Sequence, residues 1–425
     1  MTKLIGSNLK LSFFKSVYSF FFTQAFFSIS LLIVGILTAR ILGPEGRGIY
    51  SLFFTYVGFG ISFLNFGISQ SNIFFYKNYD KQSLLGNTIF AFIISVLMAG
   101  VSAFFLDCMN VFNLPVSLLI ICFSATLLHT YITGLYLGGG YISQYNRTQA
   151  LHGAILLLAT FVLIPFPNLV EYSVGIRVGG TVLVAVTFTL YLVSLAKIKQ
   201  LKVNVSLLQS QARFGFKNWA QNLLGQFNYR IYPIALAFTL DDSAIGIYSV
   251  ALLTIETIRF APDALCTLLF PELMSMNNQS TKNHATAQML RIILVITVFL
   301  GSFVFIITPK IIPMVFGEDY SSAVPLVRLM MVGVIVGASY QTLTRFFSAI
   351  NKQTYSIISG SVGALFGIIT LFIFMPLYGI LGAAISFSVT QSAVGISTLL
   401  IFKLYTKMQF KDILSLSFDD FKFSK

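Results

Sequence analysis

Long apolar stretches separated by short polar links dominate the chain. A bilayer-spanning helix needs about 20 apolar residues, and the runs lack the strict alternation of barrel strands. Because backbone groups in hydrocarbon must be satisfied within a segment, we expect helices. The pattern predicts an all-α polytopic membrane protein of about twelve transmembrane helices. The predicted spans are 16–39, 48–72, 84–106, 115–138, 150–166, 172–196, 217–240, 245–271, 289–308, 323–350, 353–375 and 378–402.

A short repeat divides these spans into two halves. The tetrapeptide Gly48-Ile49-Tyr50-Ser51 recurs 198 residues later as Gly246-Ile247-Tyr248-Ser249, and both copies open the second span of a half. An even number of helices per half makes the halves parallel repeats, related by an axis along the membrane normal. We therefore expect an N-terminal six-helix bundle at 1–200 and a cytoplasmic linker at 201–216. A C-terminal six-helix bundle with a short cytoplasmic tail would follow at 217–425.

Composition agrees with a membrane protein and changes how its charge is interpreted. The chain is 56% hydrophobic and only 10% charged, with a mean hydropathy of +0.84, whereas soluble domains carry about 25% charged residues. A formal net charge of +13 would suggest nucleic-acid binding in a soluble protein. In a membrane protein it is typical of cationic cytoplasmic loops, so we expect no nucleic-acid partner.

The distribution of lysine and arginine predicts the orientation. Placing the N-terminus in the cytoplasm puts nearly all loop cations on the cytoplasmic side, as the positive-inside rule requires. Only Arg40, Arg47 and Lys310 fall on the outer side. Both termini are then cytoplasmic, and the stretch containing Arg40 and Arg47 is the first outer loop. The corresponding loop of the second half carries Asp241 and Asp242 instead.

Charged residues inside the spans are the candidate functional groups. No catalytic triad, phosphate loop or set of metal ligands is evident, so we expect no enzyme, cofactor or metal. His129 and His152 are interpreted as hydrogen-bonding groups between helices rather than metal ligands. An intramembrane arginine costs about 2.5–3.5 kcal/mol on insertion scales, so such residues usually face a bundle interior or a wet cavity. The arginines concerned are Arg177, Arg230, Arg259, Arg328 and Arg345.

These arginines, with Arg40 at the outer mouth, predict a cationic path for an anionic group. Guanidinium grips phosphate bidentately, so a phosphate or diphosphate is the expected cargo. The seventh span adds amides at Asn222 and Gln226, which favour a cavity wall. The substrate-binding candidates are therefore Arg40, Arg177, Arg230, Arg259, Arg328, Arg345, Asn222 and Gln226.

Other roles stay open for part of this set. Glu256, Arg259 and Asp263 stand at i, i+3 and i+7 on one helical face, so Arg259 is either neutralised there or part of an ion-coupling site. Glu256 and Asp263 are the ion-coupling candidates. Arg177 and Arg328 lie near span ends, where long side chains can also snorkel toward the interface.

The chain resembles the polysaccharide-transport family, of the O-antigen-unit flippase type, in the multidrug/oligosaccharidyl-lipid/polysaccharide flippase superfamily. The resemblance rests on five motifs in order along most of the chain. They are Thr38-Ala39-Arg40-Ile41-Leu42-Gly43-Pro44-Glu45-Gly46-Arg47-Gly48-Ile49-Tyr50-Ser51, Gly246-Ile247-Tyr248-Ser249, Phe270-Pro271-Glu272-Leu273, Phe316-Gly317-Glu318-Asp319-Tyr320 and Leu377-Tyr378-Gly379-Ile380-Leu381-Gly382-Ala383-Ala384. One departure is Asn65-Phe66-Gly67, where members often carry an acidic residue before the glycine.

The resemblance implies two bundles around a central cavity that opens alternately to each side. It implies that a polyprenyl-diphosphate-linked oligosaccharide is moved from the inner to the outer leaflet of the bacterial cytoplasmic membrane for O-antigen or capsule synthesis. Membrane lipids, a polysaccharide polymerase and a chain-length regulator are the further partners expected. Because Asn65 replaces the acidic residue, ion coupling would have to rest on Glu256 or Asp263.

Two other functions are alternatives to this one. A drug/cation antiporter of the same superfamily would be expected to have a carboxylate-dominated cavity, whereas arginines outnumber carboxylates inside these spans. A polysaccharide polymerase or ligase usually needs a long outer loop for the growing sugar chain, and every predicted outer link is short.

Overall fold

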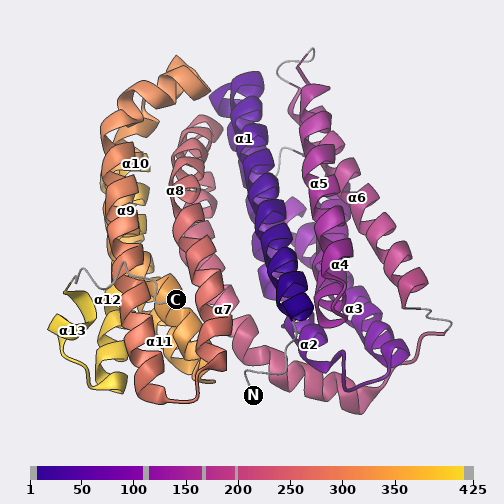
Figure 1. The fold of residues 1–425 in the computed structure, drawn as a ribbon. Helices are drawn as coiled ribbons and strands as arrows, with labels where there is room; N and C mark the ends of the chain where they lie inside the picture. The colour runs from indigo at the N-terminus through magenta and orange to yellow at the C-terminus, as the bar shows by residue number, and fades with distance from the viewer. Residues whose placement is uncertain (1–6, 109–113, 165–168, 197–199, 416–425) are drawn as a thin grey trace. The chain divides into compact units, whose positions relative to one another are not determined.

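The computed structural model describes residues 7–108, 114–164, 169–196 and 200–415, and these residues form helices joined by short links (Figure 1). The all-helical fold class is therefore confirmed. The helices are α1 (Ser7–Leu64), α2 (Ile68–Phe75), α3 (Lys81–Cys108), α4 (Val116–Gly138), α5 (Ile142–Phe161), α6 (Val170–Leu195), α7 (Val205–Ala237), α8 (Asp242–Ser275), α9 (Gln279–Phe316), α10 (Ala323–Ala349), α11 (Thr354–Tyr378), α12 (Ile380–Thr406) and α13 (Phe410–Leu414), with a 3₁₀ turn at Glu318–Tyr320.

Most of the predicted spans lie on a single helix. The span predicted at 48–72 is an exception, because it begins on α1, contains the corner after Leu64 and ends on α2. Within the described part of the chain, eight helical stretches are long and apolar enough to cross a membrane. The longest is Phe21–Leu64, with 44 residues. Helices α5, α7 and α8 are not among the eight, and these three carry most of the polar side chains discussed below. The protein is thus a multi-pass membrane protein.

The predicted outer loop around Arg40 and Arg47 is wrong, because this stretch is helical. The helix α1 is interrupted only at Gly43, whose φ of 66° and ψ of 179° are outside helical values. This backbone conformation is essentially restricted to glycine. Pro44 follows at the first position of the next helical segment, where its fixed φ suits a helix start and its missing N–H costs nothing. One residue therefore makes the break for which a whole loop was expected.

The internal repeat extends to the helix starts. Asp241 caps the N-terminus of α8, accepting a hydrogen bond from the Ala244 backbone N–H, and it lies 198 residues after Gly43. The repeated tyrosines, Tyr50 and Tyr248, each follow their helix start by the same interval and are both buried. The two copies of the motif thus occupy equivalent positions in their helices.

The chain divides into two compact units, Met1–Trp219 and Ala220–Lys425. In the first unit, α1 packs on α5, and α4 contacts α2, α3 and α6. In the second unit, α10 contacts α8, α9 and α12, while α11 packs along α12. Small residues allow the closest approaches, as at Gly395 of α12, which lies against the backbone at Val336 of α10.

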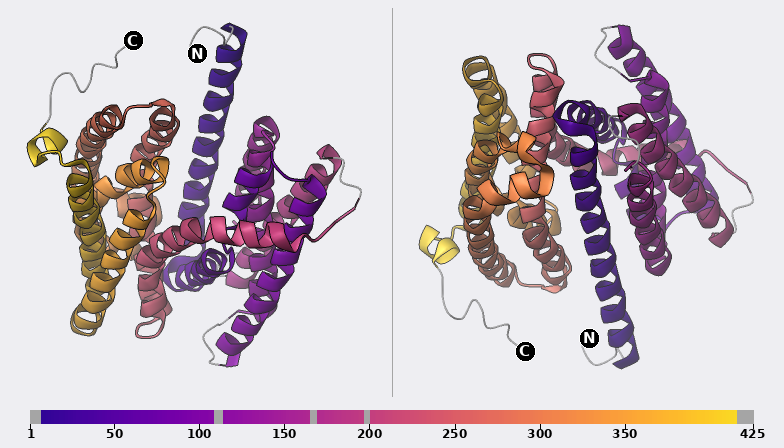
Figure 2. Two further views of the ribbon diagram at one scale, coloured as in Figure 1. Left: turned by 90° about the horizontal axis from the view of Figure 1, so that it is seen from below. Right: turned by 90° about the horizontal axis from the view of Figure 1, so that it is seen from above.

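The stretch predicted as a linker, 201–216, is ordered against the first unit. From Val205 it is the first part of α7, which runs crosswise to the other helices of that unit (Figures 1 and 2). Amide side chains hold it there. Asn87 of α3 donates to the Asn204 carbonyl at 3.0 Å and to Gln211 Oε1 at 3.1 Å, and it accepts from the Asn204 N–H at 2.8 Å. Gln211 in turn donates to Asn72 Oδ1 of α2 at 2.9 Å.

A second contact joins α7 to the corner between α1 and α2. Phe66 and Gly67 both have positive φ there. The indole N–H of Trp219 donates to the Phe63 carbonyl at 2.8 Å, and its ring stacks on Phe66. Gly67 and Gly215 lie backbone to backbone, leaving no room for a Cβ on Gly67. The motif that departs from the family pattern therefore forms the corner on which α7 rests.

We expect Asn87→Ala to destabilise the first unit by about 1–3 kcal/mol, because it leaves the buried Gln211 oxygen and the Asn204 N–H without their partner. The measurement is thermal unfolding with a thiol-reactive dye in a Cys108→Ser background. In this background the buried thiols Cys122 and Cys266 report on the first and second unit respectively.

Single-reporter proteins, retaining either Cys122 or Cys266, show which unit unfolds first. The control is Ser206→Ala, which removes an exposed hydroxyl from the same part of α7. Asn87→Ala should lower the Cys122 transition, and Ser206→Ala should leave it in place. Equal effects of the two variants would contradict the assigned role of Asn87.

Candidate functional site

The second unit gathers five of the charged residues predicted from the sequence. Arg230 comes from α7, Glu256, Arg259 and Asp263 come from α8, and Arg345 comes from α10. We call these five residues the arginine cluster. Electrostatic interactions join Arg230 to Glu256, and they join Asp263 to both Arg259 and Arg345. Three formal positive charges face two negative ones, so the cluster has a net positive charge.

The three α8 members lie on one face of their helix because of their spacing at i, i+3 and i+7. Arg259 is partly buried, and its guanidinium lies 4.6 Å from the centroid of the Tyr229 ring of α7. This is a cation–π distance, which stabilises a desolvated guanidinium. Arg259 is thus held both by Asp263 and by an aromatic face. This arrangement favours a structural role for Arg259, because its positive charge is already balanced by these two partners and is less available to a ligand.

Arg230 is held from its own helix. Its Nε donates to Gln226 Oε1 at 2.7 Å, one turn earlier on α7. Asn222, Gln226 and Arg230 stand at i, i+4 and i+8 and so share one face of α7. Asn222 is exposed, while Gln226 and Arg230 are partly buried. The guanidinium of Arg230 therefore keeps donors beyond the one given to Gln226.

Arg345 is the exposed arginine of the cluster. Its neighbours on α10, Thr344 and Phe346, are both buried, so the helix packs on either side of an arginine that faces outward from the core. Asp263 lies between Arg345 and Arg259 in the chain of electrostatic interactions. Among the three cluster arginines, Arg345 is the most accessible to a ligand.

The first unit holds a separate group of cations, which includes the predicted Arg177. The Arg177 Nη1 donates to the Tyr50 hydroxyl at 2.7 Å, and its guanidinium lies 3.8 Å from the centroid of the Phe54 ring. The guanidinium of Arg47 lies 5.4 Å from the centroid of the Tyr50 ring, and its Nη1 donates to Thr38 Oγ1 at 2.6 Å. We call Arg47, Tyr50, Phe54 and Arg177 the Tyr50 group. Arg40 is exposed on α1, close in sequence to this group.

Sequence reasoning missed Arg47 as a buried residue. The sequence places it in the first outer loop, whereas its side chain is only 7% exposed. The available signal was Gly43-Pro44 just before it, a glycine and proline pair that can break and restart a helix within a single residue. With helix on both sides, Arg47 and Thr38 come within hydrogen-bonding distance.

Arg328 lies outside the arginine cluster. It is near the start of α10, where its guanidinium lies 4.9 Å from the Phe305 ring of α9 and its Nε donates to the Phe305 carbonyl at 3.4 Å. The Phe305 ring is itself 42% exposed. This position fits the snorkelling role better than a place in a binding path.

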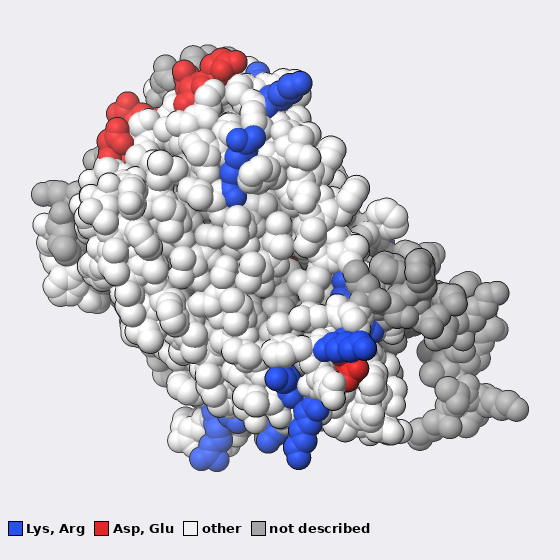
Figure 3. Space-filling view, turned by 90° about the vertical axis from the view of Figure 1, so that its left-hand side faces the viewer, with Lys and Arg blue, Asp and Glu red and all other residues white. Residues whose placement is uncertain are grey.

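Charge is separated between the two ends of the second unit. Figure 3 shows most of the acidic side chains of the visible face at one end, with some basic ones nearby, and most of the basic side chains at the other end. At the acidic end, Asp241 and Asp242 lie beside the α7–α8 link, and Glu318 and Asp319 lie in the α9–α10 link. The opposite end carries exposed or partly exposed lysines, namely Lys282, Lys352, Lys403, Lys407 and Lys411.

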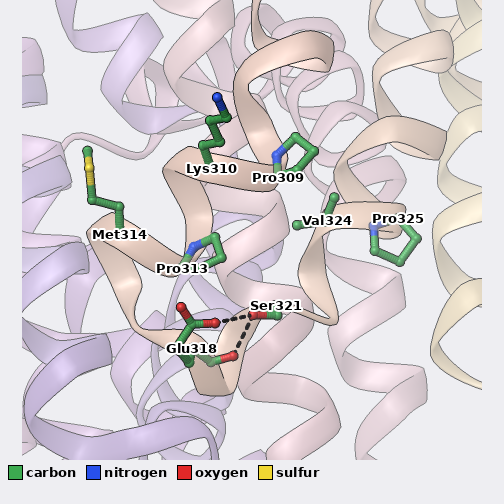
Figure 4. Close-up of a pocket in the computed structure, with 8 residues that line it drawn as sticks. All are labelled: Pro309, Lys310, Pro313, Met314, Glu318, Ser321, Val324 and Pro325. Carbon is green, nitrogen blue, oxygen red and sulfur yellow. Dashed lines mark hydrogen bonds between the residues drawn. The ribbon is translucent and has the colours of Figure 1, made fainter.

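A hollow of about 700 Å³ lies at the acidic end, at the link between α9 and α10 (Figure 4). Three prolines, Lys310 and Glu318 are among its lining residues, and Ser321 donates to the Glu318 carboxylate at 3.2 Å. No residue of the arginine cluster lines this hollow. Within the described residues, no group of three or more His, Cys, Asp or Glu is placed to hold a metal ion.

The fold is similar to that of solved membrane transporters. The "Lipid II flippase MurJ, inward closed conformation" matches with a TM-score of 0.77 and 17% identity, covering 94% of this chain and 90% of that one. An inward-facing multidrug resistance MATE family transporter of the MOP superfamily matches at 0.69 and 14% identity, covering 90% and 94%. A MOP superfamily transporter from Pyrococcus furiosus, described with a binding pocket of reverse polarity, matches at 0.64 and 12% identity, covering 92% and 94%.

Sequence comparison adds the family. No curated protein sequence matches the chain. The motif containing Phe270, Pro271 and Glu272 lies outside the described side chains, so the structure adds nothing to that part of the resemblance. A family model described as "Polysaccharide biosynthesis protein" matches residues 37–325, which is more than half of the chain. This match and the fold confirm the expected resemblance. The chain belongs to the polysaccharide biosynthesis protein family and has the fold of MOP-superfamily transporters.

Proposed function

We propose that the protein is a flippase for a polyprenyl-diphosphate-linked oligosaccharide, which it moves from the cytoplasmic to the outer leaflet during surface polysaccharide synthesis. The observation that carries the proposal is the arginine cluster, a net positive group on membrane helices of a polysaccharide biosynthesis protein. The likeness to a lipid II flippase supports it at the level of the fold. An oligosaccharide unit of O-antigen or capsule is a cargo consistent with a polysaccharide biosynthesis protein.

The diphosphate is the part of this cargo that needs the protein most. Removing a dianion from water is costly, and guanidinium groups can replace that water with bidentate hydrogen bonds. An inside-negative potential favours outward movement of charge −2 by about 5 kcal/mol per 100 mV. The protein therefore has to lower the desolvation barrier and release the anion, while the prenyl tail stays in lipid.

Within the second unit, we assign Arg230 and Arg345 to the diphosphate because they have free donors or exposure. The amides of Asn222 and Gln226 suit sugar hydroxyls. Arg259 has a supporting role beside Tyr229 and Asp263. Glu256 and Asp263 set the charge of the cluster and are the ion-coupling candidates on this unit.

In the first unit, we assign Arg177 and Arg40 to later contacts with the anion. Arg40 lies near the Gly43 break of α1, and Arg177 lies near the start of α6. Arg328 is the least suited of these arginines to bind substrate, because its guanidinium already contacts the ring and the backbone carbonyl of Phe305. The bundles predicted at 1–200 and 217–425 are proposed as the two halves of the transporter, and the stretch 201–216 belongs to the first compact unit.

The same proposal fixes the orientation. The basic end of the second unit faces the cytoplasm of a bacterial cell, since cytoplasmic loops are enriched in lysine and arginine. Both termini then lie inside. A polysaccharide polymerase and a chain-length regulator act on the product at the outer face. The likeness of the fold to transporters supports a transport role rather than catalysis.

A drug/cation antiporter is the second candidate, because MATE transporters share the fold. The positive balance of the cluster disfavours cationic cargo, since like charges repel in a low-dielectric site. Deleting the gene in its host tests both functions. A flippase predicts loss of surface polysaccharide and unchanged resistance to cationic dyes such as ethidium. Increased ethidium sensitivity with normal surface polysaccharide would support the antiporter instead.

A further inference from the structure

Two histidine rings meet inside the first unit, away from the arginine cluster. His129 of α4 and His152 of α5 lie with their ring centroids 5.2 Å apart in an edge-to-face arrangement. The ring centroid of Phe27 of α1 lies 5.3 Å from that of His152, and the Phe188 ring of α6 stacks on the His129 ring with the same centroid distance of 5.3 Å. The two imidazoles are therefore held together between aromatic rings from two further helices.

Three of the four ring nitrogens of this pair are buried and have no hydrogen-bond partner among the described residues. Among the described residues, Nδ1 of His129 and both ring nitrogens of His152 are buried without a hydrogen bond. His152 is only 8% exposed. Buried polar groups are nearly always satisfied by protein or water, so unpartnered nitrogens on two rings in edge-to-face contact are candidates for binding a proton or an internal water.

A strip of polar residues leads from this pair to the surface. Tyr145, Gln149 and His152 share one face of α5, at i, i+4 and i+7. The Tyr145 hydroxyl accepts from Gln149 at 3.0 Å and from Gln24 of α1 at 2.9 Å. Beside it, Asn146 donates to the hydroxyl of the exposed Ser19 at 2.9 Å.

The strip also contains acceptors that the protein does not use. Oε1 of Gln149 and Oδ1 of Asn146 are buried without a partner among the described residues. Together with the histidine nitrogens they form a line of unsatisfied groups that ends at an exposed serine. Internal water bridging such groups would form a continuous hydrogen-bonded path along α5.

We propose that His129 and His152 bind the proton that drives transport, and that the polar strip of α5 connects this pair to the aqueous phase. This inference rests on the proposed flippase function and adds a coupling site to it. Histidine changes its charge near physiological pH, and histidine chains inside membranes serve as proton relays. The site lies in the same unit as Asn65, where the family often has an acidic residue.

The proton is transferred without any other reactant. A ring nitrogen lone pair of one imidazole accepts an excess proton carried by hydronium in the strip, which leaves neutral water behind, and the resulting imidazolium can pass the proton to a lone pair of the other ring. Release reverses these steps. The pair is suited to sharing one proton, since two adjacent imidazolium charges would repel each other in a buried site.

The ionisable neighbours come from each helix packed around the pair. Arg177 of α6 acts electrostatically on His152 and opposes a second positive charge. Tyr145 lies along α5, and Tyr136 of α4 stacks on Phe188. From α1 the described neighbour is the uncharged Phe27 ring. The proton bound by the pair is therefore linked to the position of Arg177 in the Tyr50 group.

Nuclear magnetic resonance of ring-¹⁵N-labelled histidine tests the site directly, because the whole chain contains only 3 histidines. The full-length protein in lipid nanodiscs is titrated between about pH 5 and 8, the range in which histidine changes charge. His284, which is exposed on α9, is the internal reference and is assigned with His284→Gln. The proposal predicts that both other rings titrate, and that His129→Gln shifts the titration of His152.

Neutral rings at both positions throughout the titration would overturn the proposal, as would two rings that titrate independently. The wild-type spectrum decides the first point even if the His129 variant does not fold. Because this measurement uses no transported substrate, it remains informative if the proposed flippase function fails.

A cellular measurement tests the coupling. A deletion strain is complemented with wild type, His152→Gln, His284→Gln or Asp263→Asn, and surface polysaccharide is compared with and without nigericin, which collapses the pH gradient. The proposal predicts nigericin-sensitive production for wild type and His284→Gln, and low, nigericin-insensitive production for His152→Gln. A His152→Gln response like that of wild type, with loss of the response in Asp263→Asn, would move the coupling site to the second unit. If polysaccharide does not depend on the protein at all, the flippase function fails and the titration alone decides the proton site.

Discussion

Replacing Arg230 by alanine is expected to lower surface polysaccharide by about tenfold to a hundredfold, the equivalent of one charge-assisted hydrogen bond to phosphate, about 1.5–3 kcal/mol. Arg230 is held by Gln226 at 2.7 Å and balanced by Glu256, which leaves further donors of its guanidinium for a ligand. The measurement is surface polysaccharide in a deletion strain complemented with the variant, normalised to the amount of protein in the membrane.

Arg328→Ala is the matched control for this variant. Both residues are partly buried arginines of the second unit, but Arg328 lies on Phe305 and outside the arginine cluster. Arg328→Ala should therefore keep most of the activity. Arg230→Lys should restore only part of it, because an ammonium cannot reproduce the bidentate contact. Equal losses in Arg230→Ala and Arg328→Ala would contradict the assignment of the site.

Gly67→Ala is expected to destabilise the first unit by about 2–5 kcal/mol, adding left-handed strain of about 1–2 kcal/mol to a backbone clash of about 1–3 kcal/mol. Gly67 has φ 71° at the start of α2. A Cβ there would overlap the Gly215 carbonyl, so the first part of α7 would have to move away from the corner. Unfolding reported by Cys122 should shift to lower temperature.

Gly140→Ala separates the two contributions. Gly140 also has a positive φ, 72°, but a Cβ there would meet nothing within 4 Å. Its substitution therefore carries the strain without the clash, and its transition should lie between those of wild type and Gly67→Ala. Fluorescence of Trp219, the single tryptophan, should change in Gly67→Ala alone, because its ring stacks on Phe66 at this corner. Identical behaviour of the two glycine variants would exclude the Gly67–Gly215 contact as the cause.

The helices could be predicted from the sequence because lipid allows few alternatives. An apolar run of sufficient length must satisfy its backbone internally, so its position fixes the helix within a few residues. The span predicted at 323–350 corresponds to α10, Ala323–Ala349. The start of α9 was harder to predict, because the helix begins at Gln279 with several polar turns that precede the apolar run.

The links between helices were less predictable than the helices. A glycine followed by proline can end one helix and begin the next, and local sequence does not distinguish this from a loop. Gly43 is such a case, and the break there buries Arg47. The stretch 201–216 is polar enough to look like a free linker. Its order comes from Asn87 of α3, which is more than a hundred residues away in the chain.

The candidate site, too, could be predicted only where local spacing decides the positions of its residues. The i, i+3, i+7 spacing on α8 places Glu256, Arg259 and Asp263 on one face from sequence alone. Packing between helices decides the rest. The contact of Arg177 with Tyr50 joins residues 127 positions apart, and no local pattern encodes it. The meeting of His129 with His152 depends likewise on how α4 and α5 pack.

The most direct measurement of the central claim is the sidedness of the lipid-linked oligosaccharide in intact cells. A membrane-impermeant reagent labels periodate-oxidised sugar at the outer face, and total lipid-linked sugar is measured after lysis. The account predicts that deletion leaves the oligosaccharide inside, that the wild-type gene restores outer labelling and that Arg230→Ala restores little of it. Normal outer labelling in the deletion strain would contradict the claim that this protein moves the lipid-linked sugar across the membrane.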